Sequence, residues 1–319
     1  MTGGNRMADR SIRVRVPGTS ANLGAGFDTL GLACNLYNEL ELTLTERPGL
    51  SISVEGEGAG RIPEDDRNIV WRSIQLLLER SHHEKEYQGA IIRMKNEVPL
   101  SRGLGSSATA IVSGLKAANV IIGNKYNRRE LLQLATEIEG HPDNVAPAIF
   151  GGFTVSTMKG RHVESFSFLP KIRLRFVVAV PDFFLPTKKA REVLPETVPR
   201  ADAIFNIGRA SMLVAALMKG SAYFLRRSFD DALHQPYRAQ LIPGMYDVFR
   251  AARAAGALGT VLSGAGPCLI SFVEERDERE EAVGEAMREA FEKHGVKAEI
   301  KHLGLDTRGA HIVNRNHQA

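Results

Sequence analysis

Two glycines followed by two serines form the segment of this chain that is best suited to hold an anion. Gly103, Gly105, Ser106 and Ser107 lie in the run Pro99-Leu-Ser-Arg-Gly-Leu-Gly-Ser-Ser-Ala-Thr109, at the expected start of a helix. Glycines let a backbone approach a phosphate and adopt positive φ, and the free N–H groups of a helix N-terminus attract anions. Serine hydroxyls can bind phosphate oxygens or Mg²⁺. The run predicts a phosphate site; a serine-capped turn that binds nothing is the alternative.

Two known phosphate motifs can be compared with this run. A Walker A loop needs Lys before its Ser or Thr, and that Lys is absent here. The dinucleotide fingerprint matches Gly103-Leu-Gly-Ser-Ser-Ala108, but Pro99 separates it from the preceding strand, and Asn124 stands about where an acid is expected. A dinucleotide oxidoreductase is therefore the weaker alternative, beside a module that binds ATP or an anion without catalysis.

Asn22 and Asp28 lie in a second glycine-rich segment, over 17–28. An amide and a carboxylate on such a loop suit a polar substrate with hydroxyl or amine groups. The alternative is a capped turn leading into a short helix at about 27–32.

Glu139, His141 and Asp143 form a compact polar cluster at the expected end of another helix. Glu139 could complete a magnesium shell with a serine of the first run. Asp143 could orient or deprotonate a hydroxyl. A helix C-cap followed by an Asx turn is the alternative.

A fourth segment, Ser263-Gly-Ala-Gly-Pro267, lies between two expected strands. It predicts a hairpin turn or a turn that faces a substrate. Lys188, Arg191 and Arg238 lie in expected loops, where arginine offers a two-pronged fork for a carboxylate. A solvated surface charge is the alternative for each of these three residues.

Alternating strands and helices must position these segments. Apolar periodicity predicts strands near 12–16, 40–44, 52–54, 90–94, 172–180, 258–263, 268–273 and 296–302. It predicts helices near 70–78, 105–121, 131–138, 202–218, 245–255 and 276–294, the first of them capped by Asn68. The C-terminal pattern fits a ferredoxin-like module. A polar stretch near 160–171 predicts two domains, 10–165 and 166–305.

The composition of the chain argues against several classes of protein. The 319 residues carry 41 Lys+Arg against 37 Asp+Glu, a net charge of +4 that is too small for a dedicated nucleic-acid binder. Cys34 and Cys268 are too few for a disulfide framework and favour a reducing compartment. Residues 1–10 lack an apolar leader, and no long apolar run predicts a membrane span. We expect a soluble cytoplasmic protein that binds neither nucleic acid nor membrane.

Together, the glycine-rich segments resemble those of the GHMP small-molecule kinases. Pro99-x-x-x-Gly-Leu-Gly-Ser-Ser-Ala108 resembles the phosphate loop of that family, and Ser263-Gly-Ala-Gly266 resembles its C-terminal glycine motif. The resemblance covers about 11–302. Within the family, segments 16–28 and 141–147 are most similar to those of the homoserine kinases.

The resemblance implies an α+β fold with a ribosomal-protein-like N-terminal domain and a ferredoxin-like C-terminal domain. ATP would lie between them, and its γ-phosphoryl group would pass to the hydroxyl of L-homoserine, giving O-phospho-L-homoserine for threonine biosynthesis. The chain would act with Mg²⁺ and as a homodimer.

The resemblance also implies roles for individual residues. The magnesium ligands would be Ser106, Ser107 and Glu139, and the catalytic residues would be Ser106, Glu139 and Asp143, the last orienting the substrate first and acting as a base second. ATP would contact Asn68, Pro99, Leu100, Ser101, Arg102, Gly103, Leu104, Gly105, Ser106, Ser107, Ala108 and Thr109. Homoserine would contact Asn22, Asp28, His141, Asp143, Thr187, Arg191, Arg238 and Gly264.

Overall fold

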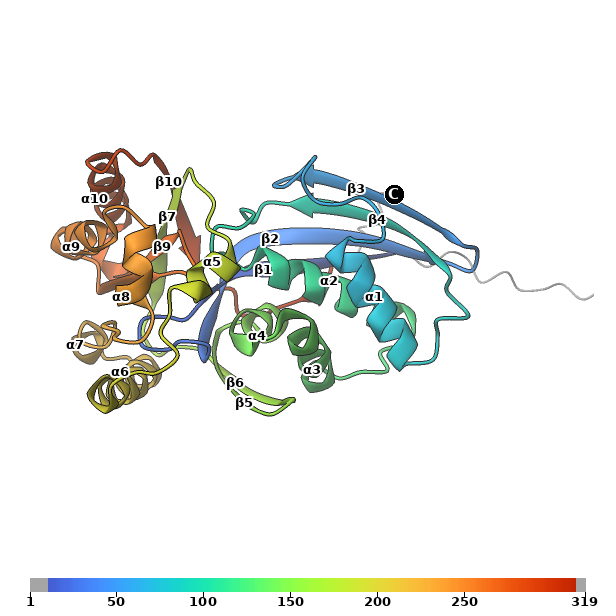
Figure 1. Cartoon of the computed structure of the whole chain (residues 1–319), viewed down its shortest axis with the longest axis horizontal. Helices are drawn as coiled ribbons and strands as arrows, with labels where there is room; N and C mark the ends of the chain where they lie inside the picture. The colour runs from blue at the N-terminus through green and yellow to red at the C-terminus, as the bar shows by residue number, and fades with distance from the viewer. Residues whose placement is uncertain (1–10, 314–319) are drawn as a thin grey trace, which may run out of the picture.

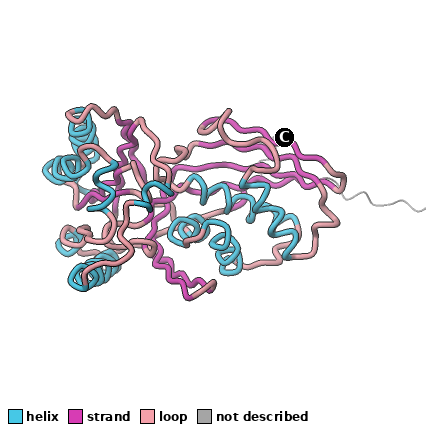
Figure 2. The backbone as a smooth tube through the Cα atoms, viewed as in Figure 1, coloured by secondary structure: helices cyan, strands magenta, loops and turns pink. Residues whose placement is uncertain are grey.

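The computed structural model describes residues 11–313 and builds them around two β-sheets (Figure 1). The first sheet has the order β11-β1-β2-β4-β3, and the β5–β6 hairpin extends it from β2. Its strands are β1 (Ser11–Ala21), β2 (Leu30–Thr45), β3 (Gly49–Gly56), β4 (Gly89–Asn96), β5 (Phe153–Lys159), β6 (His162–Phe168) and β11 (His311–Ile312). In Figure 2 the hairpin projects away from the long strands.

Helices cover one face of the first sheet because its strands are apolar on that side. In β4, Ala90, Ile92 and Met94 are buried, whereas Ile91 between them is exposed. The covering helices are α1 (Ile69–Arg80), α2 (Ser106–Ile121), α3 (Arg128–Glu139) and α4 (Pro142–Phe150). Asn68 caps α1 as expected, since its side chain accepts a hydrogen bond from the Val70 N–H at 2.9 Å.

The second sheet is antiparallel with the order β10-β7-β9-β8, which confirms the ferredoxin-like expectation. Its strands are β7 (Leu174–Pro181), β8 (Gly259–Leu262), β9 (Leu269–Glu274) and β10 (Ala298–Gly304). The accompanying helices are α5 (Thr187–Glu192), α6 (Arg200–Lys219), α7 (Ala222–Leu225), α8 (Gln235–Arg238), α9 (Met245–Ala255) and α10 (Glu280–Glu292), with short 3₁₀ turns at Ala239–Leu241 and Glu275–Asp277.

A shared apolar core joins the two sheets. Leu32 and Phe153 of the first sheet pack in one buried cluster with Phe176 and Phe272 of the second. The division into 10–165 and 166–305 stays a prediction, and β6 (His162–Phe168) crosses it.

Four local expectations are wrong. Lys188, Arg191 and Arg238 were expected in loops, but the first two lie in α5 and Arg238 lies in α8. β1 continues through Pro17 to Ala21, with a register shift at Pro17 and Gly18, so the segment expected to be a loop begins as a strand. β2 begins at Leu30, which leaves no helix at 27–32. The β5–β6 hairpin occupies most of the stretch expected to be a polar connection. In the three cases that involve strands, pairing with a neighbouring strand decides the conformation, and that neighbour is invisible in the local pattern.

The expectations on location are tested only in part. Residues 1–10, on which the absence of a leader rests, lie outside the described residues. Within 11–313 one helix, Arg200–Lys219, is long and apolar enough to cross a membrane, by length and composition only. Its Leu213, Ala216 and Leu217 are buried in the core of the second sheet, so we interpret it as a surface helix of that half. Cys34 and Cys268 are buried and free.

Candidate active site

A cleft of about 360 Å³ lies between the two halves and collects most of the predicted site residues. Ser101 to Gly103 and Gly105 to Ser107 line it from the first half, together with Glu139, His141 and Asp143. The second half contributes Thr187, Arg191, Arg238 and Gly264. Segments that are far apart in the sequence therefore meet at one surface.

The two glycines of the predicted phosphate loop are required by close packing against neighbouring atoms. Gly103 has φ +87°, and a Cβ there would lie 2.1 Å from the carbonyl oxygen of Ser263. Gly105 has φ +70°, and a Cβ there would lie 2.0 Å from Oγ1 of Thr19. Ser263 also donates its hydroxyl to the carbonyl of Gly103 at 2.6 Å. The C-terminal glycine motif thus holds the phosphate loop from the other half of the molecule.

The N-terminus of α2 presents unused donors to the cleft. Gly105 is the N-cap residue and makes no side-chain cap hydrogen bond, so a serine-capped turn is not formed. Ser106 and Ser107 are the first residues of the helix and line the cleft. Free N–H groups and the helix dipole favour a phosphate at this position.

Ser107 and Glu139 place two oxygen donors side by side. The Ser107 hydroxyl donates to Glu139 Oε2 at 2.7 Å, although 32 residues separate them. Burial raises the pKa of Glu139, and the hydrogen bond from Ser107 opposes that rise. Hydroxyl and carboxylate oxygens are the donors that Mg²⁺ prefers. No group of three His, Cys, Asp or Glu residues that could hold a metal occurs within 11–313, so phosphate and water oxygens would have to complete such a shell.

His141 and Asp143 form a hydrogen-bonded pair at the start of α4. His141 Nδ1 lies 2.8 Å from Asp143 Oδ1, and Asp143 is only 1% exposed. Burial lowers the pKa of His141, but the hydrogen bond and the charge of Asp143 outweigh it, so the net pKa is raised. The sequence had not predicted α4, because Pro147 lies inside this helix of nine residues and interrupts the helical pattern.

Asp28 and Asn22 hold the first glycine-rich segment in place. Asp28 forms a two-bonded ion pair with Arg191. Asn22 accepts from the Asp28 N–H at 2.9 Å and donates to the carbonyl of Gly264 at 2.8 Å. The oxygen of the Asn22 amide therefore stabilises the segment itself, and its nitrogen joins the segment to the C-terminal glycine motif.

Arg238 is a buried cation at the same end of the cleft as Arg191. Burial lowers its pKa to about 10, and the charge of Arg191 adds to the effect. The group therefore remains charged near neutral pH. Phe27 packs against both guanidinium groups, with its ring centroid 5.5 Å from Cζ of Arg191 and 5.2 Å from Cζ of Arg238.

Some predicted residues support the cleft without lining it; among the described residues, these are Asn68, Pro99, Leu104, Ala108, Thr109 and Asp28. Asn68 is occupied by its cap and by the carbonyl of Pro63. Thr109 donates to the carbonyl of Ser106 and accepts from Asn38.

Sequence reasoning missed one end of the cleft, which is lined by Arg61, Ile62, Pro63, Arg67, Ile69, Met94 and Asn96. Within the described part of the chain, Oδ1 of Asn96 is buried without a hydrogen-bond partner. No motif marks these residues, because they come from the loop before α1, the start of α1 and the end of β4, which only the fold brings together.

Two family profiles match the chain. The profile described as GHMP kinases N terminal domain matches residues 68–152. The profile described as GHMP kinases C terminal matches residues 212–293. These two matches fall on the two halves that form the cleft.

Curated relatives extend the match to nearly the whole chain. A homoserine kinase of Carboxydothermus hydrogenoformans is 46% identical over 299 residues, covering 94% of this chain and 96% of the relative. A homoserine kinase of Moorella thermoacetica is 44% identical over 300 residues, covering 94% and 99%.

Solved structures of other proteins have the same fold as this chain. A homoserine kinase from Cytophaga hutchinsonii superposes with a TM-score of 0.87 at 33% identity, covering 96% of this chain and 98% of that one. A mevalonate kinase of L. major superposes with a TM-score of 0.71 at 18% identity, covering 92% and 95%, which indicates a common fold alone. With both profiles, the long curated alignments and the common architecture in agreement, the chain belongs to the homoserine kinase family of the GHMP kinases.

Proposed function

We propose that this enzyme transfers the γ-phosphoryl group of ATP to the side-chain hydroxyl of L-homoserine, forming O-phospho-L-homoserine and ADP in threonine biosynthesis. The observation that carries the proposal is the composition of one cleft. A glycine loop at the N-terminus of α2 suits a triphosphate, and Arg191 and Arg238 suit a carboxylate at the same cleft. Asp28, paired with Arg191, suits the substrate ammonium.

In the proposed reaction the homoserine oxygen forms a bond to the γ-phosphorus. The bond from that phosphorus to the β,γ-bridging oxygen breaks, and ADP leaves with the electron pair. Such transfers depend mostly on positioning and on stabilisation of charge. The N–H groups of the loop and of α2 would hold the phosphates, and the two arginines would hold the substrate carboxylate.

Asp143 would orient the attacking hydroxyl and would accept its proton as a secondary role. Its carboxylate is buried at the cleft and fixed by His141, which suits a group that must point in one direction. Ser106, Ser107 and Glu139 would hold Mg²⁺, which when bound neutralises charge on the phosphates. Ser107 and Glu139 already contact one another, and their oxygen chemistry suits that ion.

A substrate panel tests the proposal. ADP release is measured with ATP and Mg²⁺ in the presence of L-homoserine, L-threonine, mevalonate or galactose. We expect homoserine to give much the highest kcat/KM. Turnover of another hydroxyl compound in preference to homoserine would replace the proposed substrate, and binding of ATP without any turnover would indicate a non-catalytic module.

A homodimer and a cytoplasmic location belong to the same proposal. The buried free cysteines support a reducing compartment. Ile204, Ile207 and Tyr223 of α6 and α7 are well exposed, and exposed apolar side chains on two successive helices would suit an interface. Sedimentation velocity of the purified protein gives the oligomeric state, and a monomer at micromolar concentration would exclude the dimer.

A further inference from the structure

The buried guanidinium of Arg238 is held by neutral acceptors. Its Nε donates to the carbonyl of Ala190 at 3.0 Å. Its Nη1 donates to the carbonyl of Gly264 at 3.3 Å and to Nδ1 of His234 at 3.3 Å. These bonds do not use Nη2, and Arg238 lines the cleft. The orientation of the guanidinium therefore decides which N–H groups an anion in the cleft can meet.

His234 can support that orientation in only one tautomer. Its Nε2 lies 2.7 Å from the carbonyl oxygen of Gly24, which can only accept, so Nε2 carries the proton. A guanidinium can only donate, so Nδ1 facing Arg238 must be without a proton. Burial is the main cause that lowers the pKa of His234, which keeps the ring neutral beside the cation.

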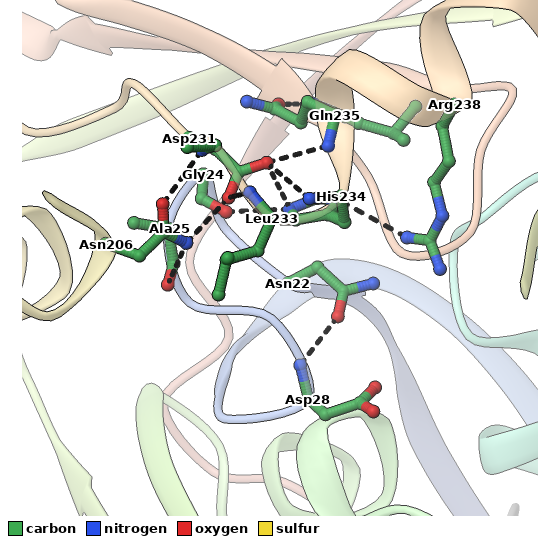
Figure 3. Close-up of polar contacts among 12 residues, drawn as sticks. Asn22, Gly24, Ala25, Asp28, Asn206, Asp231, Leu233, His234, Gln235 and Arg238 are labelled. Carbon is green, nitrogen blue, oxygen red and sulfur yellow. Dashed lines mark hydrogen bonds and ion pairs between the residues drawn. The ribbon is translucent and has the colours of Figure 1, made fainter. Parts of the chain in front are cut away.

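We propose that His234 is a positioning residue that sets the orientation of the Arg238 guanidinium and, through it, the preference for an alcohol substrate that carries a carboxylate. This inference rests on the proposed function, in which Arg238 meets the carboxylate of homoserine. Figure 3 shows His234 between Asp231 and Arg238, with Asn22 and Asp28 drawn below it.

Asp231 fixes the backbone from which His234 projects. Its buried carboxylate accepts from the N–H groups of Leu233, His234 and Gln235 at 3.1, 2.9 and 2.7 Å. It also accepts from Nδ2 of Asn206 at 2.7 Å, which ties the start of α8 to α6. Four donors to one carboxylate leave the first turn of α8, and so the Cα of His234, little freedom.

The loop that carries Asp28 holds the other side of the ring. Gly24 supplies the carbonyl acceptor for Nε2, and Phe27 stacks on His234 with centroids 5.2 Å apart and planes at 20°. His234 is thus in contact with both sides of the proposed substrate site: the loop bearing the carboxylate for the ammonium, and the arginine for the substrate carboxylate. A change at His234 should disturb carboxylate recognition more than ATP binding.

Two amide variants separate the two contacts of the ring. In His234→Gln the amide reaches about as far as Nε2, so a donor to Gly24 is kept and the acceptor for Arg238 is lost. In His234→Asn the amide reaches about as far as Nδ1, so an acceptor for Arg238 is kept. The asparagine variant is therefore the matched rescue for the glutamine variant.

The readout is the preference for homoserine over 3-amino-1-propanol, the same amino alcohol without the carboxylate. In His234→Gln we expect the ratio of the two kcat/KM values to fall roughly 10- to 100-fold, the range for a hydrogen bond to a charged group. The fall should come mainly from the KM for homoserine, with the KM for ATP unchanged. His234→Asn should keep a ratio close to that of the wild type. If 3-amino-1-propanol turns over too slowly, its inhibition constant replaces its kcat/KM.

Results that contradict the role of His234 can be distinguished from results that contradict the proposed function. The preference for homoserine could fall equally in both variants, or kcat/KM could fall equally with both alcohols. Either result would show a merely structural role and overturn the inference while leaving the proposed function intact. A wild-type enzyme that does not phosphorylate homoserine would overturn the proposed function and the inference with it. Should both variants fail to fold, the ¹⁵N spectrum of histidine-labelled wild-type protein decides: a proton on Nε2 alone supports the inference, and a proton on Nδ1 overturns it.

Discussion

Arg191 and Asp28 are joined by two hydrogen bonds at the cleft, Nη1 to Oδ2 at 3.1 Å and Nη2 to Oδ1 at 2.6 Å. The hydrogen bond to Asp28 is the main cause that raises the pKa of Arg191. The guanidinium of Arg191 is complementary to the carboxylate of an amino acid, and the carboxylate of Asp28 is complementary to its ammonium group. In this structure the two side chains pair with each other. Binding of homoserine would exchange this one pair for two ion pairs to the substrate.

Arg191→Lys should weaken homoserine binding because lysine keeps the charge but loses the planar fork. We expect the KM for homoserine to rise roughly 10- to 100-fold, with a smaller change in kcat and none in the KM for ATP. Steady-state ADP release measures all three constants. Arg200→Lys, at the start of α6, is the control, and an unchanged homoserine KM in Arg191→Lys would exclude the proposed contact.

Glu139→Gln should raise the Mg²⁺ concentration needed for half-maximal activity. Loss of the carboxylate removes a charged oxygen ligand, and we expect an effect on the order of 10- to 100-fold, as for other groups that support a bound metal. Glu137→Gln is the matched control, because Glu137 lies on the same helix and pairs with Arg80 at the surface. Equal magnesium titrations for the two variants would contradict the assignment.

Gly103→Ala should cost more stability than Gly123→Ala. The two residues have nearly the same φ, +87° and +89°, so the strain of a left-handed alanine, about 1–2 kcal/mol, is common to both. A Cβ at Gly103 would also collide with the carbonyl of Ser263, whereas nothing lies within 4 Å of one at Gly123. Urea unfolding measures both free energies. We expect only Gly103→Ala to raise the KM for ATP, and equal effects would contradict the packing of the loop.

The variant Asp143→Asn distinguishes the two roles proposed for Asp143, which are to orient the substrate hydroxyl and to accept its proton. An amide still accepts a hydrogen bond through its oxygen but cannot take a proton, and a general base contributes roughly 10²–10⁴-fold. We expect kcat in Asp143→Asn to fall by less than that range, and Asp143→Ala to fall further because it cannot orient the hydroxyl. If the two variants lose kcat equally, by about 10³-fold, Asp143 acts chiefly as the base.

Cys34 and Cys268 should resist alkylation in the folded protein. Burial raises the pKa of Cys34 to about 12 and raises that of Cys268 as well, so the thiolate is scarce in both. Raising the pH from 7 to 9 should therefore leave both thiols unmodified by iodoacetamide in the native state. In urea both should react, because unfolding returns their pKa to the ordinary range. Mass spectrometry counts the labelled residues, and rapid native labelling would contradict their burial.

Local patterns were sufficient for the parts of the site that lie within one segment. Gly103, Gly105 and Ser106 could be predicted to form a phosphate loop, because that role would depend on backbone freedom and on the start of the helix that follows. Strands such as β4 and helices such as α1 were also predictable, since their apolar periodicity reflects the core that they face. The motifs at Asp28, Glu139 and His141 were visible as polar clusters, although not as contacts.

Only the tertiary structure decided how those clusters are used. Asp28 meets Arg191 from 163 residues away, and Gly103 packs on Ser263 from 160 residues away. The proposed role of His234 depends on Gly24 and Arg238, and no local pattern connects these three residues. Hydrogen-bonding capacity belongs to a residue type and can be seen in a sequence. The choice of partner depends on which chain segments the two cores bring together, and the fold of the whole chain is what makes that choice.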